Sequence, residues 1–192
     1  QRDVMLSAEE LSATDTQRVE FVALAATAAL LETQLAIWEK TVEPTAYDPE
    51  ADARFHAAYE AWQGLDESER DLSLALDYFA QSAGLGHPLA PLALAYFHAS
   101  GFGGFPKNAE LSRRFRALAE ARLTALAETK NLWAQTYLGY LLVTGDNARD
   151  DALERPDRFE WLPQDKTRGM KWLHTAALEG AMCTPNLDDA SG

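Results

Sequence analysis

The segment "GMKWLHTAALEG", residues 169–180, is the most informative about the fold, because large and small side chains follow a fixed order among residues that favour helix. Trp172 is followed four residues later by two alanines, and Gly180 follows three residues after the second alanine. This order predicts a helix whose alanines let a neighbouring helix approach while the tryptophan fills the space beside them. The glycine is predicted to end the helix in a left-handed conformation.

The same order recurs elsewhere in the chain, at offsets 0, 4, 7, 12 and 15. The matching sets are Asp71, Ala75, Tyr78, Ala83 and Gly86, and Asp165, Gly169, Trp172, Ala177 and Gly180. A third copy keeps only Asn108, Ser112 and Phe115, and its helix is predicted to continue past the glycine position. A shorter pattern that ends in glycine precedes each copy, at residues 57–64, 94–101 and 138–145. The order helix, glycine turn, helix indicates an internally repeated, all-helical chain.

These segments resemble the Sel-one-like repeat family, relatives of the tetratricopeptide repeats. The family's second helix has the pattern K-A-x-x-W/Y-x-x-x-A-A-x-x-G, which residues 169–180 and 74–86 follow. Its first helix is matched by residues 94–103, with His98 in the usual tyrosine place. The resemblance covers Phe55 to Gly180 and implies a right-handed α-solenoid of about three helix-pair repeats.

Residues 1–54 lie outside the resemblance and are predicted to form an N-terminal helical cap on the repeat array, residues 55–192, which carries an insertion at 146–163. One helix is expected from about Asp15 to Thr41. Its predicted buried stripe consists of Leu24, Ala28, Leu31, Leu35 and Trp38. The apolar run Phe21–Trp38 approaches the length of a membrane span, but Glu32 interrupts it, so we expect a buried helix and no membrane span.

The net charge of −13 and the pI of about 4.6 disfavour binding to nucleic acid or to an anionic membrane. Residues 1–70 hold five basic and fifteen acidic side chains, against twelve and fifteen in the remainder. This acidic part is either a solvated face or a surface for a partner with a basic surface. The single cysteine, Cys183, allows no internal disulfide. The sequence begins with Gln1, which a cleaved leader or a truncation would equally explain. A periplasmic location is expected, with the cytoplasm as the alternative.

No catalytic, cofactor-binding or metal-binding residue is predicted, and the chain is not expected to be an enzyme. The four histidines, His56, His87, His98 and His174, lack metal-binding spacing. Four arginines cluster at Arg113, Arg114, Arg116 and Arg122. They are interpreted either as internal salt-bridge partners of the acidic N-terminal part or as a site for an anion or acidic partner.

The insertion at residues 146–163 carries Phe159 and Trp161 among charged side chains, a composition typical of an interface anchor with a polar rim. The alternative is that both aromatic side chains fold back over the last repeat. The predicted partner-binding residues are Trp161, Phe159, Asp150, Asp151, Phe102 and Tyr96.

The family resemblance implies a protein that binds another protein. Its most concrete form is a bacterial immunity protein that neutralises a secreted antibacterial effector. The alternative is an adaptor, scaffold or regulatory subunit of a cell-envelope complex. Family members credited with hydrolytic activity carry a cysteine pair in each repeat, and this sequence has one cysteine in all.

Overall fold

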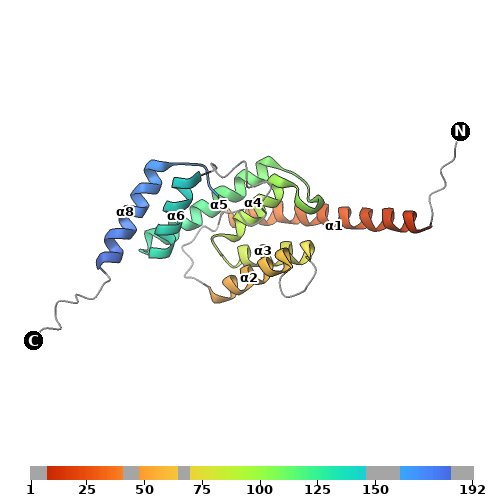
Figure 1. Ribbon diagram of the computed structural model, residues 1–192, viewed down its shortest axis with the longest axis horizontal. Coiled ribbons are helices and arrows are strands. Elements are labelled where there is room, and N and C mark those ends of the chain that lie inside the picture. The colour runs from red at the N-terminus through yellow and green to blue at the C-terminus, as the bar shows by residue number, and fades with distance from the viewer. Residues whose placement is uncertain (1–7, 41–47, 65–69, 146–160, 183–192) are drawn as a thin grey trace, which may run out of the picture.

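The computed structural model describes residues 8–40, 48–64, 70–145 and 161–182 (Figure 1). These residues form seven α-helices and one short 3-10 helix, and they contain no strand. The elements are α1 (Ala8–Trp38), α2 (Pro49–Gln63), α3 (Leu72–Gly84), α4 (Ala90–Ser100), η1 (Phe102–Gly104), α5 (Ala109–Glu128), α6 (Leu132–Thr144) and α8 (Lys166–Met182). The prediction of an all-helical chain is confirmed for this part of the sequence.

An Asp or Asn side chain begins five of these helices. Each accepts a hydrogen bond, 2.8–3.0 Å long, from a backbone N–H in the first turn, which would otherwise lack a partner. The residues are Asp48, Asp71, Asn108, Asn131 and Asp165. Three of them, Asp71, Asn108 and Asp165, are the first residues of the three sequence copies. The repeated pattern therefore marks helix starts.

The same backbone hydrogen bond precedes each of those three helices. The backbone N–H groups of these three first residues donate to the carbonyl oxygens of Ala61, His98 and Leu142, at 2.9, 2.8 and 2.9 Å. Each acceptor lies three residues before a glycine with a positive φ, namely Gly64, Gly101 and Gly145. The same backbone hydrogen bond thus ties the start of α3, α5 and α8 to the end of α2, α4 and α6, in the order that the glycine patterns predict.

Among the described helices, each packs against the next one along the chain, from α2 to α6 and from α6 to α8. The helix α1 contacts α3 and α5, and Figure 1 shows its first part projecting beyond the other helices. The core runs through the layers between these helices, and its largest fully buried side chains include Phe79, Phe97 and Phe115.

The close crossing of α6 and α8 occurs at offset 4 of the pattern. A Cβ atom added to Gly169 would lie 2.8 Å from the carbonyl oxygen of Gly139. At the same offset in the preceding pair, the Ser112 hydroxyl donates to the Ala95 carbonyl oxygen at 2.8 Å. The prediction that the alanine at offset 12 makes the approach is wrong for Ala177, which is exposed. Among the described helices, the main neighbour of α8 is α6.

The predicted helix end at Gly180 is also wrong, because α8 continues through it to Met182. Gly86, at the corresponding position, does have a positive φ of 92°. The third copy was expected to run past its glycine position, and α5 does so, reaching Glu128.

The predicted stripe of α1 is confirmed, since Leu24, Ala28, Leu31, Leu35 and Trp38 are all buried in the core. A bidentate ion pair holds the end of α1 on α5, with Arg114 Nε and Nη2 donating to the Glu39 carboxylate at 2.9 and 2.7 Å. The boundary predicted between residues 54 and 55 falls inside α2, which is continuous from Pro49 to Gln63.

Candidate partner-binding surfaces

The helix α1 carries a second apolar stripe on the side opposite its buried one. Val19, Val22, Leu30 and Ile37 are 57–69% exposed, and Ala26 and Thr33 lie between them. Their spacing of three or four residues places all six on one face of the helix. The stripe is about 27 Å long at 1.5 Å per residue. The expectation of a buried helix is therefore correct for one face only, and an apolar row of this length is typical of an interaction surface.

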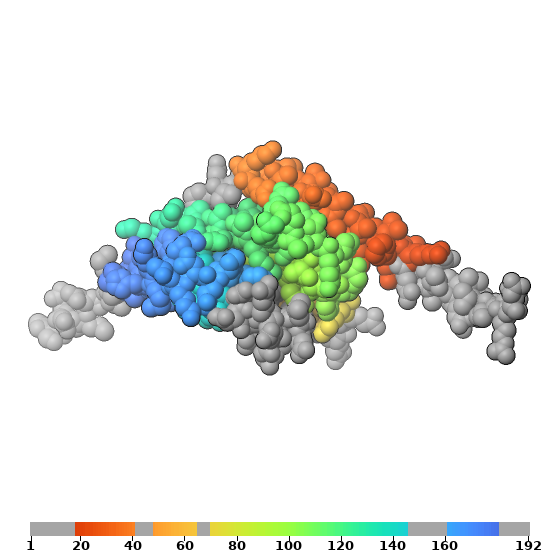
Figure 2. All heavy atoms as spheres, turned by 90° about the horizontal axis from the view of Figure 1, so that it is seen from above, coloured from red at the N-terminus to blue at the C-terminus, as the bar shows by residue number. Residues whose placement is uncertain are grey.

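The segment Arg18–Trp38 is also long and apolar enough to cross a membrane, with a mean hydropathy of 1.6. Figure 2 shows α1, in red and orange, along one edge of the molecule. Crossing a bilayer would remove its buried stripe from α3 and α5 and place Glu32 in the hydrocarbon, which costs several kcal/mol.

Trp161 packs on α5, whereas the alternative to an interface anchor places both Trp161 and Phe159 over the last repeat. The Arg116 guanidinium lies 3.5 Å from the centre of the indole ring, and its Nη1 donates to the Trp161 carbonyl oxygen at 3.1 Å. The adjacent Leu162 is fully buried. Trp161 itself stays half-buried, so one part of the ring is covered and another part lines a cavity beside α5.

The other predicted partner-binding residues have different positions. Tyr96 is a core residue with 4% exposure, packed against Trp62 and Phe97, so it cannot serve as the surface contact that the sequence predicts. Phe102 is half-buried on the same aromatic cluster. The remaining three, Phe159, Asp150 and Asp151, lie outside the described residues.

The arginine cluster divides into separate contacts. Arg114 pairs with Glu39 of the acidic N-terminal part, and Arg113 pairs with Glu110 on its own helix. The Arg114–Glu39 contact agrees with the salt-bridge interpretation, whereas the Arg113–Glu110 contact lies within α5. Arg122 is buried and donates to the Ala83 carbonyl oxygen at 2.7 Å, which ties α5 to the end of α3. Burial lowers the pKa of Arg122 to about 10.

His98 is the most deeply buried of the polar groups near that cavity. It is 1% exposed and stacks on Phe115, with 5.6 Å between the ring centres. Neither ring nitrogen makes a hydrogen bond, although the backbone at Pro106 lies close enough to favour the protonated ring. Burial dominates and lowers the pKa of His98 to about 4, so the ring is neutral at pH 7.

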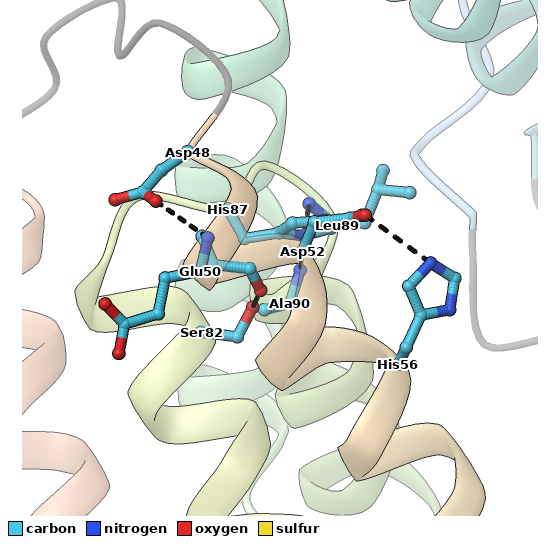
Figure 3. Close-up of polar contacts among 9 residues, drawn as sticks. Asp48, Glu50, Asp52, His56, Ser82, His87, Leu89 and Ala90 are labelled. Atoms are coloured by element: carbon cyan, nitrogen blue, oxygen red, sulfur yellow. Dashed lines mark hydrogen bonds and ion pairs between the residues drawn. The ribbon is translucent and has the colours of Figure 1, made fainter.

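Asp52 of α2 lies between two histidines that are far apart in the sequence (Figure 3). Its carboxylate oxygens are 3.6 Å from His56 Nε2 and 3.7 Å from His87 Nε2. His87 Nδ1 accepts hydrogen bonds from the backbone N–H groups of Leu89 and Ala90, at 3.2 and 3.3 Å. A neutral His87 therefore carries its proton on Nε2, toward Asp52.

This arrangement has a structural role. Because Nδ1 accepts hydrogen bonds from the start of α4 and Nε2 carries the proton, neutral His87 has no free lone pair for a metal ion or for a proton from a substrate. Burial lowers the pKa of His87 to about 4, against the opposing effect of Asp52. Within the described residues, no group of three His, Cys, Asp or Glu side chains is placed to hold a metal ion. Sequence spacing did not reveal this cluster, because α2 and the residues before α4 meet only in the fold.

The lowered histidine pKa values predict that the protein loses stability in mild acid. The unfolded chain takes up a proton on His98 near pH 6.5, whereas the folded chain does so only near pH 4, so stability falls as the pH falls between these values. From about pH 6.5 to about pH 5 the loss due to His98 is about 1–2 kcal/mol. The variant His98→Phe should lose correspondingly less, as measured by urea unfolding at each pH. Parallel losses in the variant and the wild type would contradict the assignment.

Comparison with known proteins finds no matching family model, no matching curated protein and no matching solved structure.

Proposed function

We propose that this chain is a non-enzymatic protein-binding module, most concretely a periplasmic bacterial immunity protein that neutralises a secreted antibacterial effector. An adaptor, scaffold or regulatory subunit of a cell-envelope complex is the alternative. The observation that carries the proposal is the exposed apolar stripe of α1, formed by Val19, Val22, Ala26, Leu30, Thr33 and Ile37. A partner would bury this row against an apolar surface of its own.

The architecture proposed with this function is a solenoid of three helix pairs of the Sel-one-like type, α2–α3, α4–α5 and α6–α8. Its support is the recurrence of one connecting hydrogen bond at Asp71, Asn108 and Asp165, together with the packing of consecutive helices. In such an array α1 covers one side through its buried stripe and presents the opposite stripe outward. Arrays of this kind bind partners over extended surfaces.

Charge indicates the kind of partner. The net charge of −13, with fifteen acidic side chains in residues 1–70, attracts a protein with a basic surface and speeds its association. The buried histidines give no support to catalysis, because His87 has both ring nitrogens committed and His98 is stacked in the core.

The proposal is tested by placing a charge on the stripe. In Leu30→Glu and Val22→Glu the new carboxylate points to solvent, so the free energy of unfolding should change by only about 0.5 kcal/mol. The control Tyr140→Glu replaces a side chain on α6 with the same 57% exposure as Leu30. The tagged full chain and each variant are used for pull-downs from the native cells.

We expect one stoichiometric partner with the wild type and with Tyr140→Glu, and about tenfold less of it with either stripe variant. For an immunity protein, that partner is toxic when produced alone, and co-production of the wild-type chain restores growth. A non-toxic partner lost on the same substitutions would favour the adaptor alternative. Equal capture of the partner by the wild type and by both stripe variants would overturn the proposal. Flotation of the chain with vesicles would also overturn it, if the stripe substitutions abolish that flotation.

A further inference from the structure

A cavity of about 620 Å³ lies between the end of α4, the outer face of α5 and the segment around Trp161. Its apolar wall consists of small side chains, such as Ala109 and Ala117, together with Pro163 and the Trp161 indole. Because Arg116 fixes the indole by stacking and by a hydrogen bond to its carbonyl oxygen, the wall is held in place without a ligand. The cavity has the size of a site for a small organic group.

The charges that line this cavity are opposite in sign to the charge of the whole protein. Three cations, Lys107, Arg113 and Arg116, line the cavity with one carboxylate, Glu120, and Arg113 is paired with Glu110 on its own helix. Glu120 accepts a hydrogen bond from Arg168 at 2.7 Å, which offsets its charge. In a chain of net charge −13, this local excess of positive charge favours an anionic ligand.

His98 supplies the second, independent observation. It lines the cavity, is 1% exposed, and has no hydrogen-bond partner for either ring nitrogen. A phenylalanine would pack between Phe105 and Phe115 without leaving polar atoms unsatisfied, so the histidine is costly to the fold. Unsatisfied polar groups that persist in this way are typical of functional sites.

We propose that this cavity binds a ligand that joins an apolar, ring-sized group to a carboxylate. The apolar group packs on Trp161 and the alanine wall, and the carboxylate accepts a hydrogen bond at the cationic side, from Lys107, with His98 beside it. Either a free arylalkanoate or the carboxyl terminus of a peptide ending in an aromatic residue offers this chemistry. The site is separate from the α1 stripe and does not depend on the function proposed for that stripe.

The test uses two matched pairs of probes on the isotope-labelled full chain, followed by NMR. Hydrocinnamate is compared with hydrocinnamide, and the peptide acetyl-Ala-Ala-Phe with its carboxyl-terminal amide. We expect saturable shifts at Trp161 and at the residues of α5 that line the cavity, with each acid binding about tenfold or more tightly than its amide. Tighter binding of the peptide than of hydrocinnamate would identify a peptide terminus as the source of the carboxylate. Tighter binding of hydrocinnamate would identify a free acid as the source.

Two variants separate the cationic side from the buried histidine. Lys107→Met removes an exposed charge without altering the core, and His98→Phe removes the unpaired nitrogens. Both should weaken the acid probes severalfold and leave the amides unchanged, whereas Arg54→Met, which removes a cation on α2, should change neither. Equal binding of acid and amide, or no saturable shift up to the solubility limit of the probes, would overturn the proposal. Leu30→Glu should bind the acids as the wild type does, so failure here is distinguishable from failure at α1.

Discussion

Phe115→Ala is expected to destabilise the protein by about 3–5 kcal/mol. Phe115 is fully buried on α5, and its ring stacks on His98 at an interplanar angle of 14°. Removing the ring leaves a cavity that the surrounding helices cannot close without moving. Urea unfolding followed by circular dichroism measures the loss.

Tyr78→Ala is the matched comparison, because Tyr78 occupies the same offset in the first sequence copy. Tyr78 is only half-buried, and one face of its ring lies under the Arg54 guanidinium at 5.7 Å. Its truncation should therefore cost about 1–2 kcal/mol. Equal losses of stability in the two variants would contradict this prediction. They would mean that the position in the repeat pattern, and not the burial of the side chain, determines how much the residue stabilises the protein.

The sequence was sufficient to predict features that depend on short-range chemistry. Helix starts at Asp71, Asn108 and Asp165 follow from side chains that accept a hydrogen bond from their own first turn, so no distant contact is needed. The buried stripe of α1 was also predictable, because apolar residues that recur every three to four positions indicate one buried face of a helix.

Features set by neighbours were not predictable in the same way. The pattern places Ala177 and Ala83 at the same offset, yet Ala83 is buried and Ala177 is exposed. Burial of such a residue requires a further helix on its outer side. The repeated pattern does not indicate whether that helix is present. The sequence did not predict the exposed stripe of α1, for a related reason. When the neighbouring helices are not known, an apolar residue outside the buried stripe is interpreted as a further core residue.

The cavity beside α5 was predictable in its parts but not as a whole. The sequence drew attention to the arginine cluster, to His98 and to Trp161 separately. Arg116 and Trp161 are 45 residues apart, and only the fold brings the indole over the guanidinium. The same holds for Asp52 and His87, which meet because α2 packs beside the residues that precede α4.

The crossing of α6 and α8 leads to a second prediction of large effect. Gly169→Ala should destabilise the protein by about 1–2 kcal/mol, although alanine is by itself the better helix former by about 1 kcal/mol. The added Cβ would lie 2.8 Å from the Gly139 carbonyl oxygen and 2.9 Å from the Val143 backbone nitrogen. Because both atoms belong to the backbone of α6, no side-chain rotation relieves the contact, and the helices must move apart.

Gly180→Ala is the control on the same helix and should stabilise the protein by about 0.5–1 kcal/mol. A Cβ at Gly180 meets nothing nearer than a Leu132 methyl carbon at 3.9 Å, and α8 continues through this residue with helical geometry. The two substitutions are chemically identical, so the difference of about 1.5–3 kcal/mol between their effects on stability measures the contact at the crossing apart from helix propensity. Destabilisation by Gly180→Ala would instead mean that the helix ends at Gly180 in a left-handed turn, as the repeat pattern alone predicts. Stabilisation by both would place the contact of α6 and α8 somewhere other than Gly139 and Gly169.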